Sequence, residues 1–153
     1  MKILLKLVLR AKNVRFVIRR SSTTVRIGCA SGFWGDTQTS SHQLVEYGDI
    51  DYLVSDYLSE ITMSLLTSSK KKNPKLGYAP DFVHFAVGPL LQTIKAKNIK
   101  VITNAGGINP EACAEELIRF SKSLNVDIKV AVVKGNCLNY IFTVVFLEIL
   151  KSY

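Results

Sequence analysis

The chain has 153 residues, of which 48% are hydrophobic and 21% are charged. This length fits about one domain of ~100 to 150 residues with a core of its own. The composition is that of a globular protein and excludes the fibrous and intrinsically disordered classes. The net charge of +8 would ordinarily indicate a nucleic-acid or membrane-surface partner, so the position of that charge decides the class.

The excess positive charge is confined to the start of the chain. The first 26 residues hold eight of the 20 basic residues, and the first acidic residue is Asp36. Removing these eight leaves 12 basic residues, which equals the 12 acidic ones, so the rest of the chain is formally neutral. Because nucleic-acid binding depends on clustered positive charge, we do not expect a nucleic-acid partner.

Residues 1–24 form a predicted leader segment. Lys2, Lys6 and Arg10 recur at a spacing of four, which would align them on one face of an amphipathic helix. An Arg-rich segment without acids is typical of a mitochondrial transit peptide, which predicts location in the matrix. A secretory signal fits less well because Lys6 interrupts the apolar run. A misassigned gene start also stays open, and the protein would then be cytoplasmic.

The first half of the predicted domain alternates strands with helices. Residues 25–29 are apolar enough for a buried strand, and residues 37–47 follow as a helix ended by Gly48. Residues 51–56 predict a second strand, and residues 57–68 have near-helical apolar spacing. The lysine run at residues 70–72, with Pro74 after it, is interpreted as a solvated loop.

The second half repeats this alternation. Residues 80–97 predict a helical region that Gly88 and Pro89 divide into two segments, because proline lacks the N–H donor that a helix interior needs. Residues 99–105 predict the third strand, residues 110–125 an amphipathic helix, and residues 127–133 the fourth strand.

Apolar strands that alternate with amphipathic helices indicate an α/β fold. We expect a three-layer βαβ (Rossmann-like) arrangement with a mostly parallel sheet of about four strands. The tail at residues 137–153 contains an apolar run of about 11 residues, which is short of the ~17 to 25 that a spanning helix needs. The tail therefore predicts a terminal helix or strand and no transmembrane segment.

Three loops follow the first three predicted strands and should meet at one edge of the sheet. The first, in "RIGCASGFWGD", offers Gly32 and Gly35 for close backbone approach to a ligand, Trp34 as an aromatic surface and Asp36 as a helix cap or acid. The glycine spacing differs from that of dinucleotide-binding and P-loop motifs. A purely structural tight turn stays open as the alternative.

The second loop contains Asp56, Tyr57 and Glu60. Residues four apart share a helix face, so Asp56 and Glu60 could form an acid and base pair or bind a hard metal ion. The alternative is that Asp56 caps the helix and Glu60 is a solvated acid in its first turn.

The third loop, in "TNAGGINPEA", is the sharpest candidate. Asn104 ends a strand, Gly106 and Gly107 allow a tight turn, and Asn109 precedes Pro110 at a predicted helix start. Backbone N–H groups at such a helix start attract phosphate or carboxylate groups. We therefore expect the third loop to bind an anionic ligand.

The three cysteines, Cys29, Cys113 and Cys137, lack the spacing of a metal site or a redox pair. Reduced thiols in a reducing compartment are the expectation. The sequence leaves the metal and the cofactor unknown.

Several strings together resemble the N-terminal region of the acyclic terpene utilisation family, whose members are called AtuA-like. They are "RIGCASGFWGD", "DYLVSDYLSEITMSLL", "LGYAPDF", "VITNAGGINPEACAEEL" and "KVAVVKGN", and they span residues 25–136. The resemblance implies a role in breakdown of citronellol- and geraniol-type branched isoprenoids, near acyl-CoA carboxylase components. By position, the family motifs fall on residues 32–36, 56–60 and 104–107.

Members of this family continue for several hundred residues, so the resemblance implies that the chain is a fragment whose tail at 137–153 differs from the family. The main hypothesis is an α/β domain that binds an anionic small molecule, such as an acyl-CoA. Asp36, Asp56 and Glu60 would supply acid and base groups. The alternative is a non-catalytic subunit or truncated interaction module. Whether the protein is an enzyme is left open.

Overall fold

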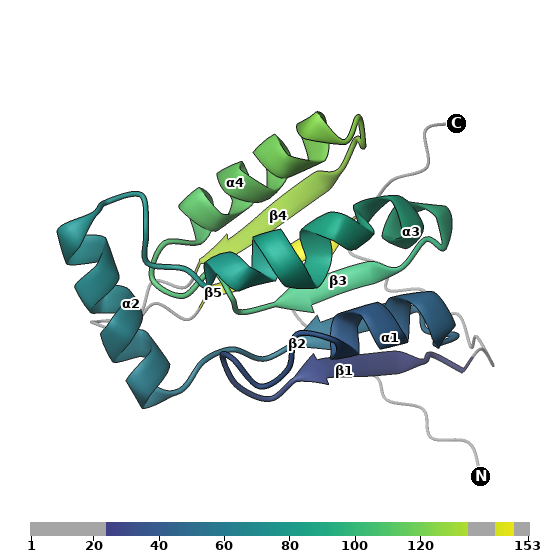
Figure 1. The fold of residues 1–153 in the computed structure, drawn as a ribbon, viewed down its shortest axis with the longest axis horizontal. Coiled ribbons are helices and arrows are strands. Elements are labelled where there is room, and N and C mark those ends of the chain that lie inside the picture. Colours follow the sequence, from purple (N-terminus) through teal and green to yellow (C-terminus); the bar gives the residue numbers. More distant parts are fainter. Residues whose placement is uncertain (1–23, 135–142, 149–153) are drawn as a thin grey trace, which may run out of the picture.

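The structure is a computed structural model that describes residues 24–134 and 143–148. The predictions for the leader before residue 24, and for the tail outside residues 143–148, lie outside the described residues. The described segments form one layer of strands and one layer of helices (Figure 1).

The sheet has five strands in the order β1-β2-β3-β5-β4. Strands β1 (Ile27–Ser31), β2 (Tyr52–Ser55) and β3 (Lys100–Thr103) are parallel neighbours. Strand β5 (Thr143–Glu148) lies antiparallel between β3 and β4 (Lys129–Lys134). The predicted α/β class with a mostly parallel sheet is confirmed. The fifth strand comes from the tail, for which both a helix and a strand were open.

The helical elements are α1 (Ser40–Tyr47), α2 (Glu60–Lys72), the π-helix η1 (Phe82–Val87), the 3-10 helix η2 (Gly88–Leu90), α3 (Leu91–Ala96) and α4 (Pro110–Ser123). The prediction that the lysine run forms a loop was wrong, because α2 continues through Lys72. Positive charge in the last turn of a helix is stabilised by the helix dipole.

Gly88 and Pro89 divide the third helical region, as predicted, but into three segments rather than two. The Gly88 N–H donates to the Val83 carbonyl. A Cβ atom at Gly88 would lie 2.1 Å from that oxygen and 2.9 Å from the Phe120 ring. Only glycine fits this position, so the π-helical turn depends on it.

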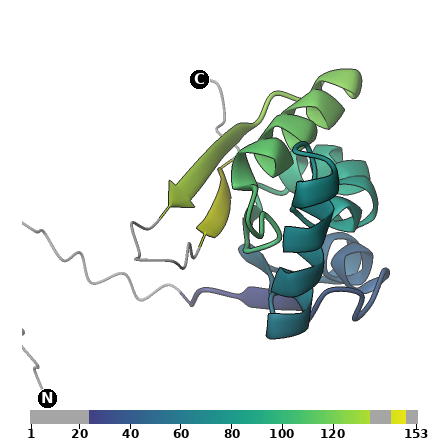
Figure 2. The ribbon, with the colours of Figure 1, turned by 90° about the vertical axis from the view of Figure 1, so that its left-hand side faces the viewer.

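The described helices all lie on one side of the sheet, as Figure 2 shows. The strand order explains this arrangement. The chain moves across the sheet in one direction from β1 to β3 and on to β4, and right-handed crossovers in one direction pass over the same face. The described part therefore has two layers, where three were expected.

Buried and exposed side chains alternate along the strands because helices pack on only one face of the sheet. Leu53 and Val101 point toward the helices and are 0% and 1% exposed, and they pack in the core with Phe82. On the other face, Ile27 is 65% exposed and Val133 is 47% exposed. We call this other surface, with Ile27 and Cys29 of β1 and Val133 of β4, the open sheet face. Within the described ranges, no helix is both long enough and apolar enough to cross a membrane.

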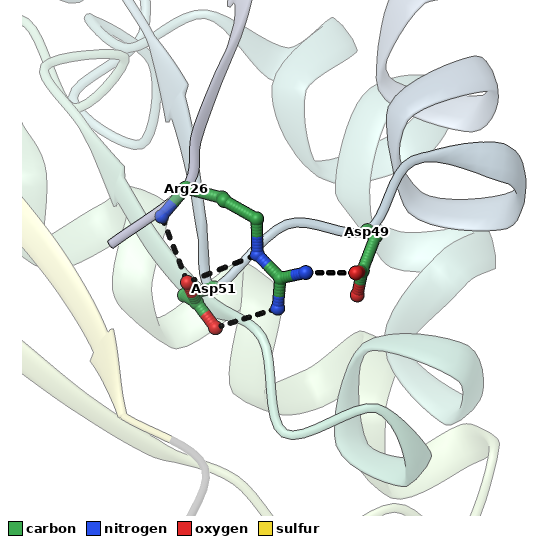
Figure 3. A network of polar contacts seen from close by, with 3 residues as sticks. All are labelled: Arg26, Asp49 and Asp51. Atoms are coloured by element: carbon green, nitrogen blue, oxygen red, sulfur yellow. Dashed lines mark hydrogen bonds and ion pairs between the residues drawn. The ribbon is translucent and has the colours of Figure 1, made fainter. Parts of the chain in front are cut away.

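Arg26 ties the beginnings of β1 and β2 together at the amino end of the sheet (Figure 3). Its guanidinium group pairs with the carboxylates of Asp49 and Asp51. Its backbone N–H donates to Asp51 Oδ2 over 2.8 Å. The hydrogen bonds from the backbone and then from the side chain of Arg26 lower the pKa of Asp51.

Candidate functional site

The parallel strands β1, β2 and β3 end side by side, and helix α2 lies beyond their carboxyl ends (Figure 1). The three predicted loops therefore start at the same edge of the sheet, as expected. We call this the carboxyl edge.

A row of buried hydroxyl groups closes the three strands at the carboxyl edge. Ser31, Ser55 and Thr103 are register partners on neighbouring strands and are 6%, 2% and 3% exposed. Ser31 donates to the Asp56 carbonyl over 3.1 Å, and Thr103 donates to the Ser55 carbonyl over 2.9 Å. Among the described residues, the buried Ser55 hydroxyl has no hydrogen-bond partner. This row was not predicted from the sequence, although each predicted strand ends near a Ser or Thr.

A β-bulge in β1 places Ser31 in this row. Register is regular up to Cys29 and resumes at Ser31, so Ala30 is the extra residue, and both Ala30 and Ser31 are buried. The Ser40 hydroxyl, at the start of α1, donates to the Ala30 carbonyl. Bulges commonly re-aim a side chain next to a functional site, and this one turns a hydroxyl toward the second loop.

Asn104 connects the second and third loops directly. Its Nδ2 donates to Asp56 Oδ1 over 2.6 Å, and its Oδ1 accepts the Tyr57 N–H over 2.8 Å. Asp56 Oδ1 also accepts the Leu58 N–H over 3.2 Å. The Asn104 amide thus fixes the orientation of the Asp56 carboxylate, which follows the neighbouring strand β2.

The structure separates Asp56 from Glu60. Helix α2 begins at Glu60, and its N-cap is Ser59, whose hydroxyl accepts the Thr62 N–H over 3.2 Å. Asp56 lies before the helix, so the expectation that it shares a helix face with Glu60 was wrong, and so was the alternative that it caps the helix. Glu60 is exposed at the start of α2.

The first loop closes on itself and then contacts the helical layer. The Asp36 carboxylate accepts the Gly32 N–H over 2.9 Å, so it does not cap α1, whose N-cap is Thr39. Trp34 is half-buried against the core, and its Nε1 donates to Asp81 Oδ1 over 2.5 Å. Gly35 has φ +88°, a backbone conformation that requires glycine.

Asp81 belongs to the site but was not among the residues predicted from the sequence. It stands at the start of η1 in the string "LGYAPDF", which carries part of the family resemblance and otherwise predicted the beginning of a helix. An acid beside a Pro is a common helix start, so the local sequence gave no signal that this carboxylate reaches Trp34.

Tyr57 lies between these groups. It is 4% exposed and packs edge-on against Phe82, with ring centroids 5.9 Å apart. Burial raises the pKa of the Tyr57 phenol, and the nearby charge of Asp81 raises it further, while a hydrogen bond with Ser31 opposes the shift. The phenol therefore stays protonated at neutral pH and can act as a hydrogen-bond donor.

The third loop makes mainly structural contacts. The Ile108 N–H donates to the Gly77 carbonyl over 3.0 Å, and Lys70 Nζ donates to the Ile108 carbonyl over 2.8 Å. Asn109 precedes α4 as predicted, but its Nδ2 donates to the carbonyls of Pro74 and Leu76 and its side chain does not cap the helix. The Asn109 side chain thus holds the segment at residues 74–76 and not the first turn of α4.

The carboxyl edge gathers carboxylates without forming a metal cluster. Within residues 24–134 and 143–148, no group of three His, Cys, Asp or Glu side chains is arranged to hold a metal ion. Cys29 is a free thiol exposed on the open sheet face, and Cys113 is a free thiol buried in the core. Burial and the charge of Glu116 raise the pKa of Cys113 to about 12, so this thiol is unreactive at neutral pH.

A surface depression of about 460 Å³ lies at the opposite end of the sheet, between the end of α4 and the start of β4. Its lining includes Ile118, Lys122, Asp127 and Ile128, and none of the predicted site residues. We place the candidate site at the carboxyl edge, because the side chains of different loops are joined there by specific hydrogen bonds.

Comparison with known proteins agrees with the resemblance noted in the sequence. No curated protein and no solved structure matches the chain. The model of the acyclic terpene utilisation family protein AtuA matches residues 25–143, which is more than half of the chain and covers all three loops. The chain therefore belongs to the acyclic terpene utilisation (AtuA) family.

Proposed function

We propose that this protein binds an amphipathic anionic metabolite of acyclic terpene breakdown, such as the CoA thioester of a branched isoprenoid acid, at the carboxyl edge. The observation that carries the proposal is the connection of the three loops around Tyr57. Asn104 holds Asp56, and Asp81 holds Trp34. A loop cluster at the carboxyl ends of parallel strands is the usual ligand position in α/β folds.

The surface near this edge has both polar and apolar parts. Phe33 in the first loop is 54% exposed, and Ile61 and Leu65 on α2 are 74% and 53% exposed. The amino end of α4, which Asn109 does not cap with its side chain, carries the positive end of the helix dipole and favours a negative charge. An apolar isoprenoid chain with an anionic end matches this combination.

The binding proposal is tested by calorimetry on the full 153-residue chain with citronellic acid, its CoA thioester and CoA alone. We expect heat of binding with the thioester. Trp34→Ala should weaken that binding by about tenfold, because an aromatic contact contributes about 0.5 to 1.5 kcal/mol. Lys122→Ala, at the opposite end of the sheet, is the matched control and should bind like the wild type. A folded wild-type protein that binds none of the three compounds would refute the proposal.

Asp36, Asp56 and Glu60 are proposed as the acid and base groups if the family catalyses a reaction. Asp56 is the strongest of the three, because Asn104 fixes its orientation. In a longer relative that turns over substrate, Asp56→Ala should lower kcat by about a hundredfold or more. Unchanged kcat in that variant would remove Asp56 from the reaction.

A second function is favoured by the third loop. Gly107, Asn109 and Ile108 are engaged in contacts within the chain, which is what a structural turn needs. The protein would then be a non-catalytic subunit or interaction module, with acyl-CoA carboxylase subunits as proposed partners. Co-purification of those subunits with the tagged chain, together with no binding of the three small molecules, would favour this function.

The proposed location is the mitochondrial matrix. It rests on the Arg-rich, acid-free segment before Thr24. A fluorescent reporter fused after residue 24 should enter mitochondria. A diffuse cytosolic signal would refute the proposal.

A further inference from the structure

The segment from Gly77 to Asp81 connects the first and third loops of the site. The Gly77 carbonyl accepts the Ile108 N–H over 3.0 Å, and the Ala79 N–H donates to the Ala105 carbonyl over 2.8 Å. Two residues further on, Asp81 Oδ1 accepts the Trp34 indole N–H over 2.5 Å. The position of Asp81 is therefore set by the third loop, and Asp81 in turn contacts the first.

The first loop has few other attachments. Its remaining described hydrogen bonds are internal: Asp36 accepts the Gly32 N–H, and the Asp36 N–H donates to the Phe33 carbonyl over 3.2 Å. Among the hydrogen bonds described for residues 32–36, the bond from Trp34 to Asp81 is the one that leaves the loop. Phe33 is 54% exposed, and nothing lies within 4 Å of the Cβ position at Gly35.

Asp81 itself is held firmly. The residue after it, Phe82, is 1% exposed and packs edge-on against Tyr57. Phe82 also begins the π-helix, whose geometry depends on Gly88. A carboxylate attached to such a rigid element can fix a mobile partner, because few of its own degrees of freedom remain to be lost.

We propose that Asp81 is a positioning residue of the ligand site: it fixes the Trp34 ring, and with it the Gly32–Asp36 loop, against the carboxyl edge. The inference rests on the proposed function for the role of Trp34 in ligand binding. The loop position itself can be measured without a ligand. A hydrogen bond to a carboxylate is stronger than a neutral one, so its loss should shift the equilibrium between held and released loop by about tenfold or more.

Trp34 reports on this bond directly, because it is the only tryptophan of the 153 residues. The experiment measures Trp emission and acrylamide quenching of the full-length chain without ligand, with circular dichroism as the check on folding. Asp81→Ala should shift the emission to longer wavelength and raise the quenching constant about twofold or more, because the released ring meets water. Asp81→Asn keeps an acceptor oxygen and should restore values close to wild type.

Glu115→Ala is the matched control for loss of one negative charge, since Glu115 is exposed on α4. It should leave emission and quenching unchanged. If folded Asp81→Ala has wild-type emission and quenching, the inference is wrong. If Asp81→Asn behaves like a folded Asp81→Ala, the acceptor atom does not position the ring, and the inference is equally wrong.

A second variant covers the case in which Asp81→Ala does not fold. Trp34→Phe keeps an aromatic ring but removes the donor, and it should accelerate amide hydrogen exchange in residues 32–38 while leaving the exchange of β2 and β3 unchanged. Unchanged exchange in residues 32–38 would overturn the inference.

Binding is measured last. With the CoA thioester of citronellic acid, Asp81→Ala should lose about tenfold in affinity and Asp81→Asn about threefold or less. If wild type binds no thioester, the proposed function fails, while the loop measurements still decide the role of Asp81.

Discussion

Replacing Gly107 by alanine tests whether the third loop is built by the fold or reserved for a ligand. Gly107 has φ +52°, and a Cβ atom there would lie 2.4 Å from Leu66 Cδ1 and 2.8 Å from the Gly77 carbonyl oxygen. Leu66 is 1% exposed, so its side chain has little room to move. The Gly77 oxygen accepts the Ile108 N–H, so the loop would lose a hydrogen bond if that carbonyl shifted.

These contacts set the free energy of unfolding that Gly107→Ala should lose. The left-handed backbone costs alanine about 1 to 2 kcal/mol. Overpacking against Leu66 adds about 1 to 2 kcal/mol, and the weakened hydrogen bond adds about 1 kcal/mol. Gly107→Ala should therefore lower the free energy of unfolding by about 3 to 5 kcal/mol, a large part of the stability of a typical domain.

Gly35→Ala is the matched control. Gly35 has φ +88° with nothing within 4 Å of its Cβ position, so this variant carries the backbone strain without the contacts. It should cost about 1 to 2 kcal/mol. Urea unfolding followed by far-ultraviolet circular dichroism measures both variants. Equal costs for the two variants would refute the reasoning, because the difference between them comes only from Leu66 and Gly77.

Three further predictions concern titrating groups. Asn104→Asp places a carboxylate 2.6 Å from Asp56, and two negative charges at that distance repel each other. In urea unfolding, the variant should have a stability close to that of the wild type at pH about 4 but lose about 1 to 3 kcal/mol at pH about 7. Equal losses of stability at both pH values would contradict this. Arg26→Ala should raise the pKa of Asp51 only part of the way to its ordinary value in an NMR titration, because the largest cause of the lowered pKa, the backbone N–H of residue 26, remains. A pKa that returned fully to the ordinary value would assign the shift to the side chain. Burial raises the pKa of Cys113 from 9.0 to about 12, so its contribution to stability is complete below pH 9 and is lost as the pH rises toward 12. Cys113→Ala should therefore lose less stability than wild type between pH about 8 and about 10.5 in urea unfolding, and an equal loss would count against the raised pKa.

The elements that the sequence predicted well are those set by local chemistry. The break at Gly88 and Pro89 and the helix start at Pro110 follow from backbone restrictions of single residues. Apolar runs located the three parallel strands to within about two residues, an error typical of element boundaries. Helix α2 was predicted at residues 57–68, so both of its ends were placed too early. Its carboxyl end was missed because a lysine run resembles a solvated loop, although lysine is a good helix former.

The part of the site that was predicted correctly follows from the direction of the strands. Parallel strands bring their loops to one edge, so Asp56 and Asn104 were correctly placed together. Asp36 was expected to cap a helix, but the tight turn let its carboxylate reach back to the Gly32 N–H. The bond from Trp34 to Asp81 joins residues 47 positions apart, and no local pattern encodes it. Their roles in binding and catalysis stay predictions.

The one-sided helix layer was not predicted because it depends on strand order, which apolar periodicity does not contain. Its consequence concerns the temperature dependence of stability. Apolar groups on the open sheet face, such as Ile27 and Val133, already contact water in the folded state, so unfolding exposes less new apolar surface. The heat-capacity increment of unfolding should then fall below the usual ~12 to 15 cal/mol/K per residue. The stability curve of this domain should therefore be flatter than that of an α/β domain whose sheet is sandwiched between helices.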